Sequence, residues 1–127
     1  MKILLDTNAV SELIKGDLSV VNLVAGHDPL VISACVYSEL YFGALNSGRA
    51  PQNLGNLAEF VEKVGILPHD EETARHAAQV RLQLKRIGRP IPANDVWIAA
   101  SAIQHSLPLL TFDAHFDAVE GLTRWRG

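Results

Sequence analysis

Four carboxylates in this chain each stand at the edge of an apolar segment, although the sequence separates them widely. They are Asp6, Glu39, Asp95 and Asp113. Two bare carboxylates about 4 Å apart repel by roughly 4 kcal/mol at an effective dielectric near 20, so four in one crevice require protons or cations. Oxygen-only ligands with no His or Cys cluster favour Mg²⁺ or Mn²⁺. Such an ion activates water for attack on phosphorus, which indicates phosphodiester hydrolysis.

Short apolar runs that suit buried strands alternate with helical patterns along the chain. Strands are expected at 3–5, 30–33, 66–67 and 109–111, with a last short one at 122–125, and helices at 9–15, 18–25, through ACVYSELYFGAL, and at 57–64, 70–87 and 95–105. The turn-rich segment 47–56 is expected to be a loop between two helices. This alternation predicts right-handed crossovers and a mostly parallel sheet sandwiched by helices, a three-layer α/β/α fold.

The predicted sheet suggests where the acids meet, because function in such sheets gathers at the carboxyl ends of the strands. Asp6, Glu39 and Asp113 each follow an expected strand, and Asp95 opens an expected helix. Each acid also has a purely structural interpretation. Asp6 could be a turn residue, Asp95 a helix N-cap and Glu39 a solvated helix residue, while Asp117 rivals Asp113 for the last position.

Composition limits the classes of protein that fit. The chain has 127 residues, 48% of them hydrophobic, which predicts one domain over residues 1–127. No apolar run approaches the ~20 residues of a membrane span, and no signal peptide is recognisable. The single cysteine, Cys35, suits a reducing compartment and is expected to fill the core. A cytoplasmic protein without a membrane segment is therefore expected.

Charge argues against general electrostatic wrapping of duplex DNA, because the net charge is −3. Five of the eleven basic residues lie between 75 and 89, where they form either a solvated helix face or the rim of a polyanion site. The five histidines are dispersed without ligand spacing, so zinc is not expected. Trp97 and Trp125 are expected to pack rather than stack on bases.

Four segments together resemble the PIN-domain family, and within it the VapC-type ribonuclease toxins of bacterial toxin–antitoxin pairs. The segments are MKILLDTNAVSELIKG, ISACVYSELYFGAL, GRPIPANDVWIAASAI and LLTFDAHFDAVEGL, which occur in the family's order and span nearly the whole chain. The resemblance implies a PIN-like α/β/α fold and a Mg²⁺- or Mn²⁺-dependent endoribonuclease. It also implies a homodimer and a small antitoxin protein whose C-terminal segment blocks the active site.

Carried over residue by residue, the resemblance places the family's catalytic acids on Asp6, Glu39, Asp95 and Asp113. Asp6 and Asp95 are the implied direct metal ligands, and Asp113 falls on the family's most variable acidic position. Asn8 and Thr111 fall where the family has supporting polar groups.

The alternative from another class is a catalytically silent PIN-like module that binds RNA or protein, which the complete acid set disfavours. A receiver-type domain is also disfavoured, because no second acid adjoins Asp6 and no Gly-rich phosphate loop is present. The choice of RNA substrate is expected to depend on loop shape and on the positions of basic residues such as Arg49, Lys85, Arg86 and Arg89.

Overall fold

The computed structural model describes residues 2–26 and 29–127. Its strands are β1 (Ile3–Leu5), β2 (Leu30–Ser33), β3 (Ile66–Leu67) and β4 (Leu109–Leu110). Its helices are α1 (Thr7–Lys15), α2 (Leu18–Val24), α3 (Ala34–Leu45), α4 (Ala50–Val64), α5 (Glu71–Arg86), α6 (Ala93–Gln104) and the 3₁₀ helix η1 (Ala114–Ala118). No helix in these two ranges is both long and apolar enough to cross a membrane.

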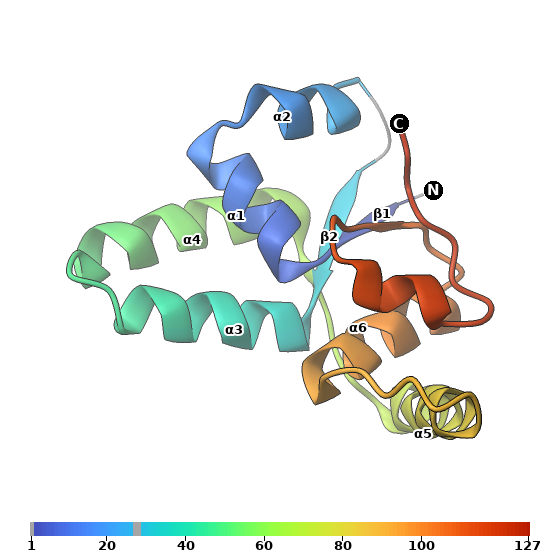
Figure 1. Ribbon diagram of the computed structural model, residues 1–127. Coiled ribbons are helices and arrows are strands. Elements are labelled where there is room, and N and C mark those ends of the chain that lie inside the picture. The colour runs from blue at the N-terminus through green and yellow to red at the C-terminus, as the bar shows by residue number, and fades with distance from the viewer. Residues whose placement is uncertain (1, 27–28) are drawn as a thin grey trace.

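The four strands form one sheet in the order β3-β2-β1-β4, and every pairing is parallel. α1 and the α3–α4 hairpin lie on one side of the strands and α5 and α6 on the other (Figure 1). The predicted α/β/α fold is therefore confirmed. The chain moves outward from β1 to β2 and β3 and then returns to place β4 on the free side of β1. The strand order thus reverses between β1 and β4, and at such a switch point the carboxyl ends of the strands leave a crevice.

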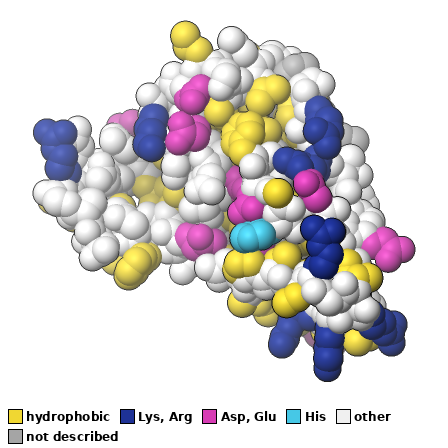
Figure 2. Space-filling model, in the orientation of Figure 1, with side chains coloured by type: hydrophobic (Ala, Val, Ile, Leu, Met, Phe, Trp, Pro, Cys, Tyr) yellow, Lys and Arg dark blue, Asp and Glu magenta, His cyan; other side chains and the backbone are white. Residues whose placement is uncertain are grey.

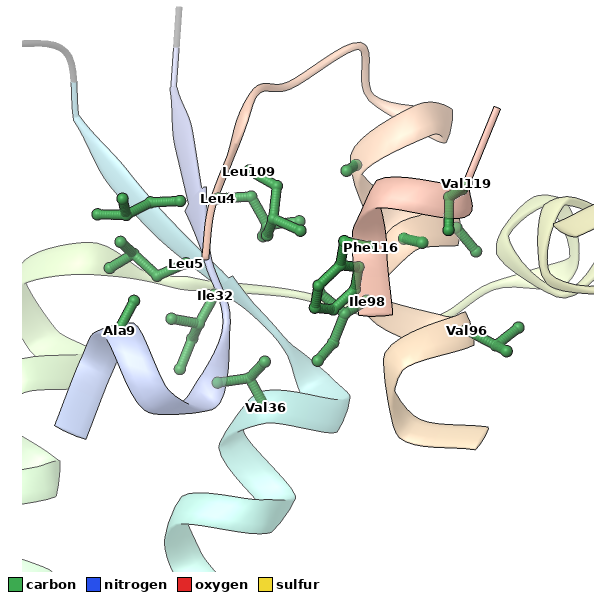
Figure 3. Packing of buried hydrophobic residues seen from close by; sticks show 14 of the residues in the cluster. Leu4, Leu5, Ala9, Ile32, Val36, Val96, Ile98, Leu109, Phe116 and Val119 are labelled. Carbon is green, nitrogen blue, oxygen red and sulfur yellow. The ribbon is translucent and has the colours of Figure 1, made fainter. Parts of the chain in front are cut away.

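The core explains why the strands are continuously apolar rather than alternating. The three residues of β1 have no exposed surface, because helices cover both faces of the sheet. Leu4 and Ile32 from the strands lie in one apolar cluster with Val36 from α3, Ile98 from α6 and Phe116 from η1 (Figure 3). This packing holds the ends of β1 and β4 against the beginnings of α3 and α6.

Two predictions about the elements were wrong in part. The expected loop at 47–56 is mostly helix, because α4 begins at Ala50 with proline in its first turn, where a missing N–H costs nothing. Leu57 is buried on this helix, so the amphipathic face outweighs the turn-rich composition. The expected strand at 122–125 is reduced to a single parallel bridge between Arg124 and Leu109.

Candidate active site

Asp6 lies where β1 ends and α1 begins, and each of its two carboxylate oxygens accepts a hydrogen bond. One carboxylate oxygen, Oδ1, accepts a hydrogen bond of 2.8 Å from the backbone N–H of Ala9, which caps α1. The other, Oδ2, accepts a hydrogen bond of 2.5 Å from the hydroxyl of Thr111. Asp6 is only 4% exposed. The turn and the site interpretations of this residue are therefore compatible.

Thr111 joins the two strands at the switch point. It follows β4 and is buried, and its hydroxyl, which donates to Asp6, also accepts a hydrogen bond of 3.0 Å from the backbone N–H of Asp113. Asp113 in turn caps η1, because its Oδ1 accepts from the backbone N–H of His115 at 2.8 Å. One hydroxyl thus sets the distance between the first and last acids of the site.

Asp95 reaches the same end of the sheet from α6. The N-cap of α6 is Pro92, and Asp95 is the third residue of the helix rather than its cap. Its Oδ2 lies 3.0 Å from Nδ1 of His115, and its side chain is 18% exposed. The N-cap interpretation of Asp95 is therefore wrong, and the carboxylate faces the residues that follow β4.

Glu39 approaches from α3, one helix turn after Cys35. The Cys35 thiol lies 4.0 Å from Oε1 of Glu39 and 3.7 Å from the backbone oxygen of Asn94, so it bridges the beginnings of α3 and α6. Cys35 packs against the core as expected, and together with Glu39 it also lines a surface pocket. Burial and the charges of Glu39 and Asp95 raise the pKa of the Cys35 thiol to about 11, which keeps the thiol protonated at neutral pH.

The acids repel one another, and burial adds to this effect. Burial is the main cause that raises the pKa of Asp6, and the charges of Asp95 and Asp113 raise it further against the hydrogen bonds from Thr111 and Ala9. Burial likewise raises the pKa of Asp95, with Asp113 adding to the rise and His115 opposing it. The pKa of Glu39 is raised by burial and by Asp95 and Asp6, while the Thr7 hydroxyl opposes the rise. The crevice therefore favours the binding of positive charge.

His115 is the site residue that sequence reasoning missed. Its Nδ1 lies 3.0 Å from Asp95 and 3.2 Å from Oδ1 of Asp113, so the ring spans two of the four acids. The dispersed spacing of the histidines concealed it, although His115 stands inside the segment TFDAHF that carries Asp113. Proximity to that acid in the sequence was the available signal.

The rival acid Asp117 points to a different partner. It forms an ion pair with Arg124, whose other nitrogen, Nη2, donates a hydrogen bond of 2.8 Å to the backbone oxygen of Thr111. Asn8 is exposed on α1, and its side chain makes no hydrogen bond to any residue within 2–26 or 29–127. The geometry thus groups Asp113 with Asp95, and among the described residues it gives the Asn8 side chain no hydrogen bond.

Several of the basic side chains lie on α5. Figure 2 shows several acidic side chains and the histidine near the middle of the visible face, with Lys and Arg side chains around them and a further group of Lys and Arg at the bottom, in the region of α5. Arg81, Lys85 and Arg86 are exposed on α5, whose opposite face is buried through Val80 and Leu84. They form a solvated helix face, as one of the two interpretations predicted. Trp97 packs against the core and stacks on His69, with ring centroids 5.1 Å apart.

The donors present fit a divalent cation. Asp95, Asp113 and His115 each offer a ligand atom, and these atoms lie within 4.8 Å of one another. The Thr7 hydroxyl, beside Glu39, is a buried polar atom without a hydrogen-bond partner of good geometry among the described residues, so it is available to a hydrated ion. Carboxylate oxygens with at most one imidazole suit Mg²⁺ or Mn²⁺ better than zinc.

These features define an α/β domain with an acidic site at its topological switch point. The PIN domain family matches residues 3–122, and the chain belongs to that family. The "tRNA(fMet)-specific endonuclease VapC" of Shigella flexneri is 34% identical over 127 residues, which cover 96% of this chain and 95% of that protein. "Ribonuclease VapC1" of Haemophilus influenzae is 33% identical over 112 residues, which cover 85% of this chain and 84% of that one.

Solved structures agree with the sequence relatives. The chain superposes on a chain of VapBC2 from Rickettsia felis, bound to a promoter DNA fragment, with a TM-score of 0.89 at 27% identity over 99% of this chain and 100% of the other. The corresponding figures for VapBC-1 from nontypeable Haemophilus influenzae are a TM-score of 0.85 and 31% identity over 98% of each chain. The resemblance found in the sequence is therefore confirmed at the level of the fold and the family.

Proposed function

We propose that this chain is the toxin of a toxin–antitoxin pair, an endoribonuclease that hydrolyses RNA phosphodiester bonds with Mg²⁺ or Mn²⁺. The observation that carries the proposal is the convergence of Asp6, Glu39, Asp95 and Asp113, from four separate elements, at the switch point of the sheet. The pKa of each of the first three is raised, partly by the charges of the others. The relatives named as VapC ribonucleases supply the RNA substrate, which the acids alone do not specify.

Each residue has a role in this proposal. Asp6 and Asp95 hold the ion, with Asp113 as a further ligand or as the group that orients its water. The ion, when bound, lowers the pKa of water and neutralises charge on the scissile phosphate. Glu39 accepts the proton of the attacking water at a carboxylate oxygen, for which its raised pKa suits it. Thr111 fixes the orientation of Asp6 through its hydrogen bond.

The solved relatives, which are VapBC complexes, support an antitoxin as partner, and the homodimer is an expectation from the family resemblance. We expect a cognate antitoxin protein, a homodimer of this chain and a cytoplasmic location, with one nuclease domain spanning residues 1–127. The RNA binds over the acidic crevice, where the metal ion offsets the repulsion between the phosphate and the acids.

The test compares Asp6→Asn and Asp95→Asn with Asp117→Asn, a matched change at an exposed acid that pairs with Arg124 instead of lining the crevice. Cleavage of total cellular RNA after brief expression is mapped for each variant. We expect the first two to lose cleavage and growth arrest while they stay folded, and the third to keep both. Full activity in both crevice variants would contradict the proposal.

A silent binding module makes a different prediction. Mn²⁺ should raise the melting temperature of the catalytic protein by mass action, and Asp95→Asn should remove that rise. RNA binding without cleavage, together with a melting temperature that Mn²⁺ does not change, would favour the silent module instead.

A further inference from the structure

We propose that His115 is a ligand of the metal ion through Nδ1, and that this nitrogen makes the site prefer Mn²⁺ over Mg²⁺. The inference rests on the proposed function, because it concerns the ion of the same site. It adds a residue that the predicted acid set did not include. It also selects one of the two ions that the carboxylates alone leave equivalent.

The position of the imidazole is the first support. Nδ1 of His115 lies 3.0 Å from Oδ2 of Asp95 and 3.2 Å from Oδ1 of Asp113. Neighbouring ligands of an octahedral ion with bonds of about 2.1 Å are about 3.0 Å apart, by the geometry of the octahedron. Nδ1 therefore already lies at the spacing of an adjacent ligand from each of the two carboxylate oxygens, and the ligand atoms of all three residues lie within 4.8 Å of one another.

The backbone around His115 supplies the second support, because it restricts where the ring can lie. The N–H of His115 donates to Oδ1 of Asp113 at 2.8 Å, and the next residue, Phe116, is buried in the core. The hydrogen bond and the buried Phe116 together fix the backbone position from which the imidazole ring extends. Its side chain is 51% exposed, so solvent and substrate reach it.

The chemistry of nitrogen gives the preference. Imidazole is a softer ligand than carboxylate and binds divalent first-row transition ions, of which Mn²⁺ is the weakest binder, whereas Mg²⁺ takes oxygen ligands almost exclusively. The ratio of the affinity for Mn²⁺ to the affinity for Mg²⁺ should therefore be larger for a site with carboxylates and one imidazole than for an all-oxygen site. A histidine that only holds Asp95 by a hydrogen bond would leave the ratio of the two affinities unchanged.

The experiment replaces the nitrogen by an oxygen at nearly the same position. His115→Asn places an amide where Nδ1 lies, and His105→Asn makes the same change at the exposed C-cap of α6. Calorimetry measures the dissociation constants of Mn²⁺ and Mg²⁺ for the two variants and the parent. Electron spin-echo modulation of bound Mn²⁺ detects a coordinated ¹⁴N nucleus directly, and thermal unfolding checks that each variant is folded.

We expect ¹⁴N modulation in the parent and in His105→Asn, and its loss in His115→Asn. The preference for Mn²⁺ over Mg²⁺ should fall about tenfold in His115→Asn, while Mg²⁺ affinity changes by less than about threefold. Bound Mn²⁺ without ¹⁴N modulation in the parent, or an unchanged preference, would overturn the inference and leave the nuclease proposal intact. If the parent binds neither ion, or if Asp95→Asn does not weaken the binding of the ion, both this inference and the nuclease proposal would be overturned.

Discussion

Asp95→Asn should make the metal-free protein more stable at neutral pH, although it removes activity. The charge of Asp95 raises the pKa of Asp6 and of Glu39, and the charge of Asp113 raises that of Asp95. Even with the full screening of water, and at about 8 Å, farther than the 4.8 Å within which the ligand atoms of Asp95 and Asp113 lie, two carboxylates repel by about 0.5 kcal/mol. Three such pairs sum to about 1.5 kcal/mol of repulsion that the amide removes.

The hydrogen bond to His115 offsets part of this gain. The amide oxygen of asparagine still accepts from Nδ1, but without charge, which costs about 0.5 kcal/mol. The net expectation is an increase of about 1 kcal/mol in the free energy of unfolding. For a domain of this size that corresponds to a rise of about 4 °C in melting temperature.

The pH dependence identifies the cause. A carboxyl whose folded pKa is raised binds more protons in the folded state than in the unfolded state, so stability falls as the pH rises through the folded pKa. The repulsion is therefore absent below the unfolded values, near pH 4, and fully present above the raised folded values of Asp6, Glu39 and Asp95. The advantage of Asp95→Asn should be largest at pH 7 and disappear near pH 4.

The assay is thermal unfolding in EDTA at pH 7 and pH 4, repeated at pH 7 with excess Mn²⁺. With Mn²⁺ the order should reverse, because the parent gains binding energy that the variant lacks. Asp117→Asn is the control and should show neither effect. The repulsion argument would be refuted if Asp95→Asn is less stable than the parent in EDTA at pH 7. It would also be refuted if the variant's gain in melting temperature is the same at pH 7 and pH 4.

The remaining predictions concern the groups around the acids. Thr111→Val keeps the shape but removes the hydrogen bonds that the Thr111 hydroxyl makes with Asp6 and with the N–H of Asp113, so the free energy of unfolding should fall by about 2 kcal/mol and Mn²⁺ should bind more weakly in calorimetry. Asp113→Asn should reduce RNA cleavage at least tenfold more than Asp117→Asn, and equal rates would contradict the choice between these acids. Asn8→Ala should cleave RNA within about threefold of the parent, because the Asn8 side chain is exposed and makes no hydrogen bond to the residues that the structure describes.

The local elements were largely predictable because their signals lie in short segments. The apolar runs of β1 and β2 are buried on both faces, and the capping box of Asp70 and Thr73 marks the start of α5. The start of α4 was not predicted, because turn-forming residues occupy a helix whose stability comes from the face that Leu57 buries. Composition over a few residues cannot show such a contact.

The sequence by itself determined which acids the chain carries and that each stands at the end of an apolar segment. It also indicated the PIN-domain family, through motifs in a fixed order. Only the tertiary structure decided that Thr111 bonds to Asp6, 105 residues away, and that His115 lies against Asp95, 20 residues away. Local periodicity fixes where a strand ends, but side chains from different segments meet only after the sheet has set their register and α6 has packed beside it.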